Sequence, residues 1–344
     1  MRKFRHLLLT FMAALLLSTA VAAESVALNK NHPESYTVVK GDTLWDIAGM
    51  FLRDPWRWPD IWYVNQQIEN PHLIYPGDVL SLTYINGKPR LTLNRGPLRL
   101  SPQIRSTPVD DAIPLIPIDA INGFLSRPYV LEKDQLETSP YVLKFADEHI
   151  MGGSGQRFYA RGSWDAETNK YDVVRKGGEY RDSVTNEILG YEALYVGSAL
   201  MQRDGDPSTL LLTNTKIESL PGDRLLPVNQ DVALRNFNPK KPENAIDGAI
   251  ISVLDGVSQI GQYNVVVIDR GTSDNVSVGD VLYIKNRGET IDDPFSGTRN
   301  DKVKLPDENA GVMLIFRTFD RVSFGIVMHA TRAMHVLDKI SSNE

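Results

Sequence analysis

The chain has 344 residues, which on a prior of ~100–200 residues per domain predicts two or three domains. It contains no cysteine, which excludes disulfide frameworks, thiolate zinc sites, iron–sulfur clusters and cysteine nucleophiles. Its formal net charge of −6 has the wrong sign for a general nucleic-acid-binding protein. Six His residues are too few for a histidine-rich metal centre, and we expect neither a metal nor another cofactor.

Residues 1–23 have the three parts of a secretory signal peptide. A basic start at residues 2–5 precedes an apolar run at 7–17, and small residues then offer cleavage after Ala22 or Ala23. The apolar run is shorter than the ~20 residues that span a bilayer. The sequence therefore predicts an exported, periplasmic protein with no membrane span after cleavage.

Residues 35–85 predict a compact module with the order strand, helix, helix, strand. The alternation around Tyr36 suits a strand with one buried face. A Lys-Gly turn follows, and Asp42 or Thr43 can cap a helix whose apolar face begins at Leu44. Asp60 can cap the second helix, and a Pro-Gly turn precedes the closing strand.

Two motifs of this module resemble the LysM domain. The first reads Tyr36-x-Val-x-x-Gly-Asp-Thr-Leu-Trp-x-Ile-Ala, and the second reads Asn70-Pro-x-x-Ile-Tyr-Pro-Gly-x-x-Leu. The resemblance implies a βααβ fold that binds glycans containing N-acetylglucosamine, such as peptidoglycan. It also implies a sugar groove between the loop after the first strand and the loop before the last. The matching positions are Gly41, Asp42, Thr43, Leu44, Asn70, Leu73 and Ile74.

Each of these positions also has a purely structural interpretation. Gly41 suits a turn, Asp42 and Thr43 suit a helix cap, and Leu44 and Ile74 suit the core. The module is also rich in tryptophan, because four of the five Trp residues lie at 45, 56, 58 and 62. Trp56 and Trp58 could extend a glycan platform by stacking on sugar rings, but packing of the two helices is the favoured interpretation.

The rest of the chain is rich in strand patterns and in linkers. We predict a Pro-rich linker at 86–118, a β domain at 119–228, a second linker at 229–245 and another β domain at 246–342. Their strand patterns are short and often apolar on both faces, as in a small barrel or sandwich. The predicted fold class is α+β, with the βααβ module followed by two mainly-β domains.

The two β domains resemble a divergent duplication. A Gly-Glu pair with an Asp three residues later occurs at 178–182 and again at 288–292, about 110 residues apart. Further matches pair Tyr195-Val-Gly with Asn309-Ala-Gly, and the strand at 208–213 with the one at 322–327.

No catalytic residue is assigned. The chain has no HExxH sequence, no Gly-x-Ser-x-Gly elbow and no phosphate-binding Gly-rich loop. A glycosidase needs a carboxylate pair ~5–10 Å apart, and acidic residues cluster in both β domains. These clusters are Glu179, Asp182, Glu187 and Glu192, and then Glu289, Asp292 and Asp293.

The expected function is non-catalytic binding of peptidoglycan in the envelope of a gram-negative bacterium. The β domains, residues 119–342, would serve as a scaffold for an envelope protein partner. Two alternatives stay open. One is a LysM-targeted glycan hydrolase that uses a carboxylate pair, and the other is an assembly adaptor whose LysM module does not bind sugar.

Overall fold

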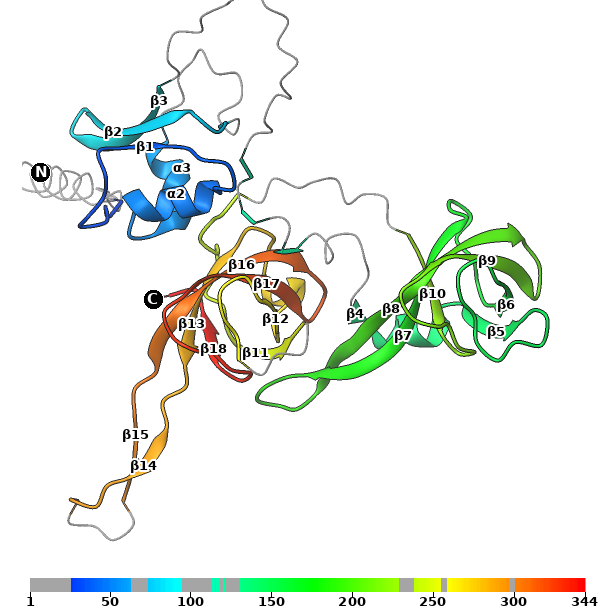
Figure 1. The fold of residues 1–344 in the computed structure, drawn as a ribbon. Helices are drawn as coiled ribbons and strands as arrows, with labels where there is room; N and C mark the ends of the chain where they lie inside the picture. Colours follow the sequence, from blue (N-terminus) through cyan, green and yellow to red (C-terminus); the bar gives the residue numbers. More distant parts are fainter. Residues whose placement is uncertain are drawn as a thin grey trace, which may run out of the picture. The chain divides into compact units, whose positions relative to one another are not determined.

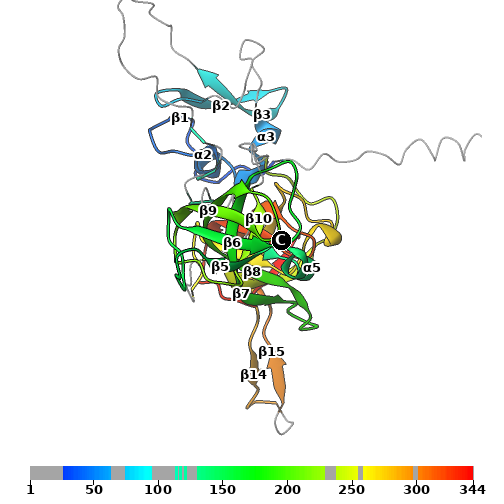
Figure 2. The same cartoon turned by 90° about the vertical axis from the view of Figure 1, so that its right-hand side faces the viewer.

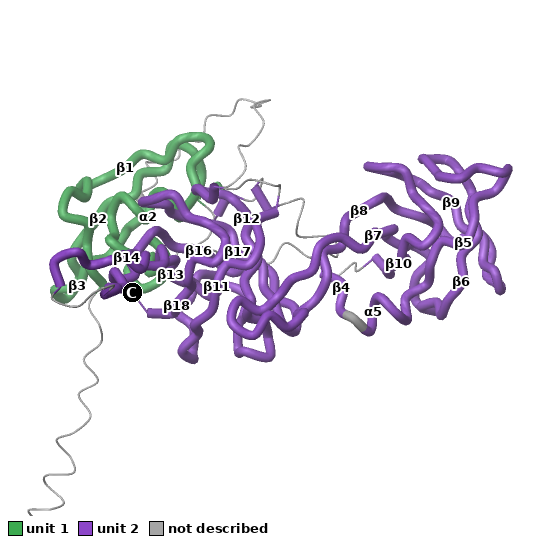
Figure 3. The backbone as a smooth tube through the Cα atoms, turned by 90° about the horizontal axis from the view of Figure 1, so that it is seen from below, with its two compact units in different colours: residues 1–113 green, residues 114–344 purple. Residues whose placement is uncertain are grey.

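The computed structural model describes residues 26–62, 74–94, 130–228, 238–254, 259–296 and 301–343, together with 113–114, 116–117 and 120–121. The predicted signal peptide therefore lies outside the described residues. The chain divides into two compact units, residues 1–113 and 114–344 (Figure 3). Within the described ranges, no helix is long and apolar enough to cross a membrane.

The first unit has the predicted order strand, helix, helix, strand (Figure 1). The second helix begins earlier than predicted, because Asp60 lies inside it and does not cap it. Its elements are β1 (Ser35–Thr37), α2 (Leu44–Phe51), η1 (Pro55–Arg57), α3 (Trp58–Ile61), β2 (Val79–Ile85) and β3 (Lys88–Asn94). β1 pairs antiparallel with β2, with Tyr36 opposite Leu80. The helices and this sheet enclose a core that includes Phe51, which is fully buried.

The sheet continues past residue 85, the predicted end of the module. β3 pairs with β2 over its whole length, from Val79 opposite Asn94 to Ile85 opposite Lys88. Leu91 of β3 is buried, and Arg90 donates a hydrogen bond to the Asp60 carbonyl at 2.7 Å. The prediction of a Pro-rich linker at 86–118 is therefore wrong for residues 88–94. A proline near the start of an edge strand is compatible with pairing, so residues 88–94 complete the first unit.

The second unit begins with a mainly-β segment whose sheet closes on itself. Its elements are β4 (Val130–Leu131), α5 (Lys133–Thr138), β5 (Tyr141–Phe145), β6 (Arg157–Arg161), β7 (Lys170–Arg181), β8 (Ile188–Arg203), β9 (Ser208–Thr215) and β10 (Arg224–Pro227). The strand order is β4-β8-β7-β10-β5-β6-β9, and β8 also pairs with β9. Strands β5 to β10 therefore form a ring, which we call barrel 1, around buried side chains such as Phe145, Phe158 and Tyr171.

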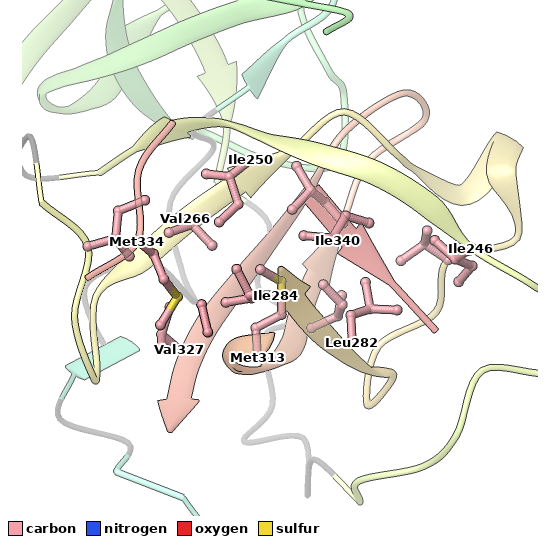
Figure 4. Packing of buried hydrophobic residues seen from close by; sticks show 14 residues of the cluster. Ile246, Ile250, Val266, Leu282, Ile284, Met313, Val327, Met334 and Ile340 are labelled. Carbon is pink, nitrogen blue, oxygen red and sulfur yellow. The ribbon is translucent and has the colours of Figure 1, made fainter. Parts of the chain in front are cut away.

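The C-terminal part of this unit is a closed barrel of six strands, which we call barrel 2. Its elements are β11 (Asp247–Val253), β12 (Val265–Ile268), η2 (Thr272–Asp274), β13 (Val281–Asn286), β14 (Thr290–Asp292), β15 (Lys302–Lys304), β16 (Glu308–Thr318), β17 (Ser323–Ala330) and β18 (Lys339–Ser341). The barrel order is β11-β12-β17-β16-β13-β18. Figure 4 shows its Ile, Val, Leu and Met side chains converging inside. The β14–β15 hairpin extends β13 and β16 away from the barrel (Figure 2).

The two barrels have the same strand order. When the six barrel strands are numbered along the chain, omitting β14 and β15, both rings read 1-2-5-4-3-6. Both also have an isolated bridge between the segment after the first strand and the segment before the last, Gly152–Ser219 in barrel 1 and Ile260–Met334 in barrel 2. The turn before the last strand is alike too, because Asp223 and Asp338 each accept an N–H from three residues earlier at 2.8 Å.

Within the second unit, the tip of the β7–β8 hairpin contacts barrel 2 through charged groups. Asp182 accepts a hydrogen bond from Arg270 at 3.3 Å, and Glu187 pairs with Arg321 at 3.1 Å. The Ser183 N–H donates to the Asp269 carboxylate at 3.1 Å.

We expect the stability of this hairpin tip to fall in strong acid. The pKa of Asp182 is lowered to about 2, chiefly because its carboxylate accepts the Thr185 and Val184 N–H groups, with Arg270 adding to the effect. A lowered folded-state pKa gives stabilisation that is present above the unfolded value of 3.8 and is lost as the pH falls toward 2. Urea unfolding of wild type and Asp182→Asn at pH 5 and pH 2.5 should differ more at pH 5. Equal differences at both pH values would contradict this assignment.

Candidate functional site

The structure brings the two loops of the predicted groove together. The loop after β1 and the loop before β2 are joined at Val38, whose N–H donates to the Asp78 carbonyl at 2.9 Å. The Val38 carbonyl in turn accepts the Gly77 N–H at 2.8 Å. Gly41 and Ile74 therefore lie in two loops that these hydrogen bonds hold next to each other.

The Lys40-Gly41 turn is closed by Asp42. Gly41 has a φ of +98°, in the left-handed region that favours glycine. The Asp42 carboxylate accepts the Val39 N–H at 2.9 Å and the Tyr36 hydroxyl at 3.0 Å. Partial burial and this hydrogen bond raise the pKa of Tyr36 above its ordinary value. Asp42 therefore fixes the shape of the loop on which the predicted groove depends.

Thr43 caps α2, as one interpretation of the sequence predicts. Its Oγ1 accepts the Asp46 N–H at 3.1 Å and donates to the Asp46 carboxylate at 2.7 Å. Leu44 and Ile74 are buried at 3% and 0% exposure. Their side chains belong to the core, so these positions can face a ligand mainly through their backbone.

Two of the predicted site residues lie outside the described residues. Asn70 and Leu73 fall in the range 63–73, so their place relative to Gly41 stays a prediction.

The two candidate platform tryptophans differ in burial. Trp58 is 3% exposed, and its ring meets that of Trp62 edge-on with centroids 5.9 Å apart. Trp58 therefore packs the module. Trp56 is half-buried, with the Arg57 guanidinium 6.0 Å from its ring centroid.

Sequence reasoning missed one exposed apolar side chain beside the paired loops. Val39 is 53% exposed, next to the buried Val38. The β alternation of the first strand could have identified it, because neighbouring residues of a strand face opposite sides. Val39 and Gly41 thus offer a small apolar surface next to exposed backbone, which suits an N-acetyl group.

The acidic clusters of the β domains are largely engaged in ion pairs and turns. Glu179 pairs with Arg181, and the pairs of Asp182 and Glu187 are described above. Asp293 accepts the N–H groups of Phe295 and Ser296 in the β14–β15 turn. Among the described residues, no group of three or more His, Asp or Glu side chains could hold a metal ion.

Comparison with known proteins supports the assignment of the first unit. The LysM domain family model matches residues 36–83. An uncharacterized protein of Bacillus subtilis, YqbP, is 44% identical over 64 residues, which cover 16% of this chain and 29% of that protein. The match thus spans less than a third of that relative's length. Residues 36–83 are therefore a LysM domain. Domains of this family typically bind glycans of the peptidoglycan or chitin type.

Proposed function

We propose that this protein is a non-catalytic, exported envelope protein whose LysM domain binds peptidoglycan. The observation that carries the proposal is the LysM match over the two loops that meet at Val38. Exposed backbone at Gly41 and the apolar Val39 suit N-acetylglucosamine units, which need a small apolar surface and backbone hydrogen bonds. Cleavage after Ala22 or Ala23 would release the chain into the periplasm of a gram-negative cell.

We also propose that barrel 1 and barrel 2 arose by duplication and act as a scaffold for an envelope protein. The shared strand order, the matching bridges and the matching Asp turns support a common origin. The hydrolase alternative is less favoured, because Glu179, Asp182 and Glu187 each pair with an arginine.

Co-sedimentation with purified peptidoglycan sacculi tests the binding proposal. We expect residues 24–344 and 24–113 to pellet and residues 114–344 to stay in solution. The N-terminal fragment ends at 113 so that it contains all of β3 and the whole first unit. If 24–113 stays in the supernatant, the adaptor alternative takes the place of glycan binding. A fall in sacculus turbidity during incubation would instead favour the hydrolase.

A substitution in the full mature chain refines the test. Val39→Asp should lower the affinity for sacculi on the order of tenfold, because one apolar contact of this size contributes ~1.5 kcal/mol. Tyr84→Ser is the matched control, since Tyr84 is an exposed apolar residue of the same module, at the β2–β3 turn. Equal losses for both variants would place the contact elsewhere.

A further inference from the structure

The β14–β15 hairpin projects from barrel 2 on a base that is fixed to the barrel (Figure 2). At this base the Gly288 N–H donates to the Asp307 carboxylate at 2.9 Å, and Asp307 also pairs with Lys339 of β18. A Cβ at Gly288 would clash with the Leu305 carbonyl, so the two chain segments approach closely there. A projecting element with a fixed base loses little conformational entropy when it binds a partner.

One face of this hairpin is apolar. Ile291 of β14 lies directly opposite Val303 of β15, and nearer the base the Leu305 N–H donates to the Glu289 carbonyl at 2.8 Å. Because alternate residues of a strand share a face, Ile291, Val303 and Leu305 lie on the same side of the hairpin. They are 43%, 42% and 40% exposed, so this apolar face is accessible.

Carboxylates border the apolar face at both ends. The Asp293 N–H donates to the Asp301 carbonyl at 2.8 Å, so the pairing register continues toward the tip. By the same alternation, Asp293 and Asp301 lie at the tip end of the apolar face and Glu289 lies at its base. The two lysines of β15, Lys302 and Lys304, lie on the opposite face. The apolar face is therefore complementary to a surface whose apolar side chains are flanked by lysine or arginine.

Barrel 1 shows how a hairpin at this place in the fold binds a neighbour. Its β7–β8 hairpin joins the third and fourth strands of the ring, as the β14–β15 hairpin does in barrel 2. The tip of the β7–β8 hairpin presents Asp182 and Glu187 to Arg270 and Arg321 of barrel 2. Acidic groups on this hairpin thus already join one domain of the chain to basic groups of another.

We propose that the β14–β15 hairpin is the docking arm of the scaffold and binds a basic amphipathic helix of a partner protein. This inference rests on the scaffold role proposed above. Two paired strands, at ~4.8 Å per strand, form a face about as wide as a helix of ~10–12 Å diameter. β14 and β15 have three residues each, so they offer little edge for the addition of a further strand.

The charges of the arm disfavour two other occupants. Face-to-face packing of two copies of the arm would bring the carboxylates of Glu289, Asp293 and Asp301 from both copies into one interface, where like charges repel. An anionic lipid surface would be repelled by the same carboxylates. A basic helix is attracted by them.

Titration of the full mature chain with designed helical peptides tests the proposal. Each peptide has about 18 residues, above the length at which isolated helices are marginal. The first has a leucine stripe flanked by lysines, the second replaces the lysines by glutamates, and the third replaces the leucines by alanines. We expect the Leu/Lys peptide to bind about tenfold more tightly than either of the others, since each lacks one of the two complementary features. Amide chemical shifts of residues 287–296 and 301–307 should move on titration.

Variants of the chain locate the peptide on the apolar face. Val303→Ser should weaken binding of the Leu/Lys peptide by about fivefold, and Asp301→Asn by about threefold. Asp292→Asn is the matched control, because Asp292 is an exposed carboxylate of the same hairpin that pairs with Lys302 on the opposite face, and its affinity should stay unchanged. The amide spectrum of each variant reports whether it is folded.

Several results would overturn the docking arm. They are no peptide binding at ~1 mM, equal binding of the Leu/Glu peptide, or an equal loss for Asp292→Asn. Dimerisation that Val303→Ser abolishes would assign the face to a second copy, and binding to phosphatidylglycerol vesicles in place of the peptide would assign it to a membrane. Shifts confined to other parts of the barrels would overturn the arm and leave the scaffold role standing. Failure of peptidoglycan binding is read separately, from residues 24–113 alone.

Discussion

Phe51→Ala should unfold the LysM domain and abolish sacculus binding while both barrels stay folded. Phe51 is fully buried at the end of α2, and truncation of a buried Phe costs ~3–5 kcal/mol. That loss is comparable to the whole stability of a module of this size. The unit makes its own compact core, so the damage should stay within it.

Tryptophan fluorescence can follow this loss with little interference. Trp45, Trp56, Trp58 and Trp62 all belong to the LysM module, and the fifth, Trp164, lies in barrel 1. The emission of Phe51→Ala should shift to the red at 25 °C, whereas Tyr84→Ala, a change at an exposed site, should leave it unchanged. A wild-type melting curve for Phe51→Ala would show that the helices are held by other contacts.

Arg175→Met should destabilise barrel 1 by ~3–5 kcal/mol, because it leaves a buried carboxylate without its cation. Asp223 is 3% exposed and accepts two hydrogen bonds from the Arg175 guanidinium, at 2.8 and 3.0 Å. Arg175 also donates to the Glu218 carbonyl at 2.8 Å. Burial lowers the pKa of Arg175 less than the Asp223 hydrogen bonds raise it, so this side chain stays charged.

Urea unfolding of residues 114–344, in which Trp164 is the sole tryptophan of the sequence, measures this effect. The Trp164 ring packs edge-on against Tyr171 of β7 with centroids 5.1 Å apart, so its emission reports on barrel 1. The double variant Arg175→Met/Asp223→Asn should lose less than Arg175→Met alone, since no unpaired charge remains.

Arg161→Met is the matched control for an exposed pair. Arg161 and Asp206 are 52% and 67% exposed, and such a pair contributes ~0–1 kcal/mol. Similar losses for the buried and the exposed pair would contradict the role of burial.

The LysM domain could be predicted from the sequence because its signals are local. The Gly-Asp-Thr turn, the Thr43 cap and the apolar face of α2 lie within a dozen residues, and all three appear in the structure. The roles of the side chains were harder to separate. Thr43 caps α2 and Leu44 packs in the core. The motif therefore identifies residues that form the fold around the groove more than residues that would contact a sugar.

The closure of the barrels could not be predicted, because it depends on pairs of distant strands. β12 pairs with β17, and β6 pairs with β9, although other strands separate them in sequence. One sequence match of the proposed duplication agrees with the rings, because Gly197 and Gly311 lie at matching places, one residue before Ser198 and Val312.

In both barrels the first and last strands are neighbours that run antiparallel. Asp247 at the start of β11 lies opposite Ser341 at the end of β18, and Tyr141 lies opposite Arg224 in barrel 1. The chain therefore enters and leaves each barrel at almost the same point. A module with adjacent ends can be inserted, removed or copied in tandem without stretching the segments on either side. Gene duplication can therefore add whole barrels to a chain of this architecture, and recombination can join the barrels to other domains.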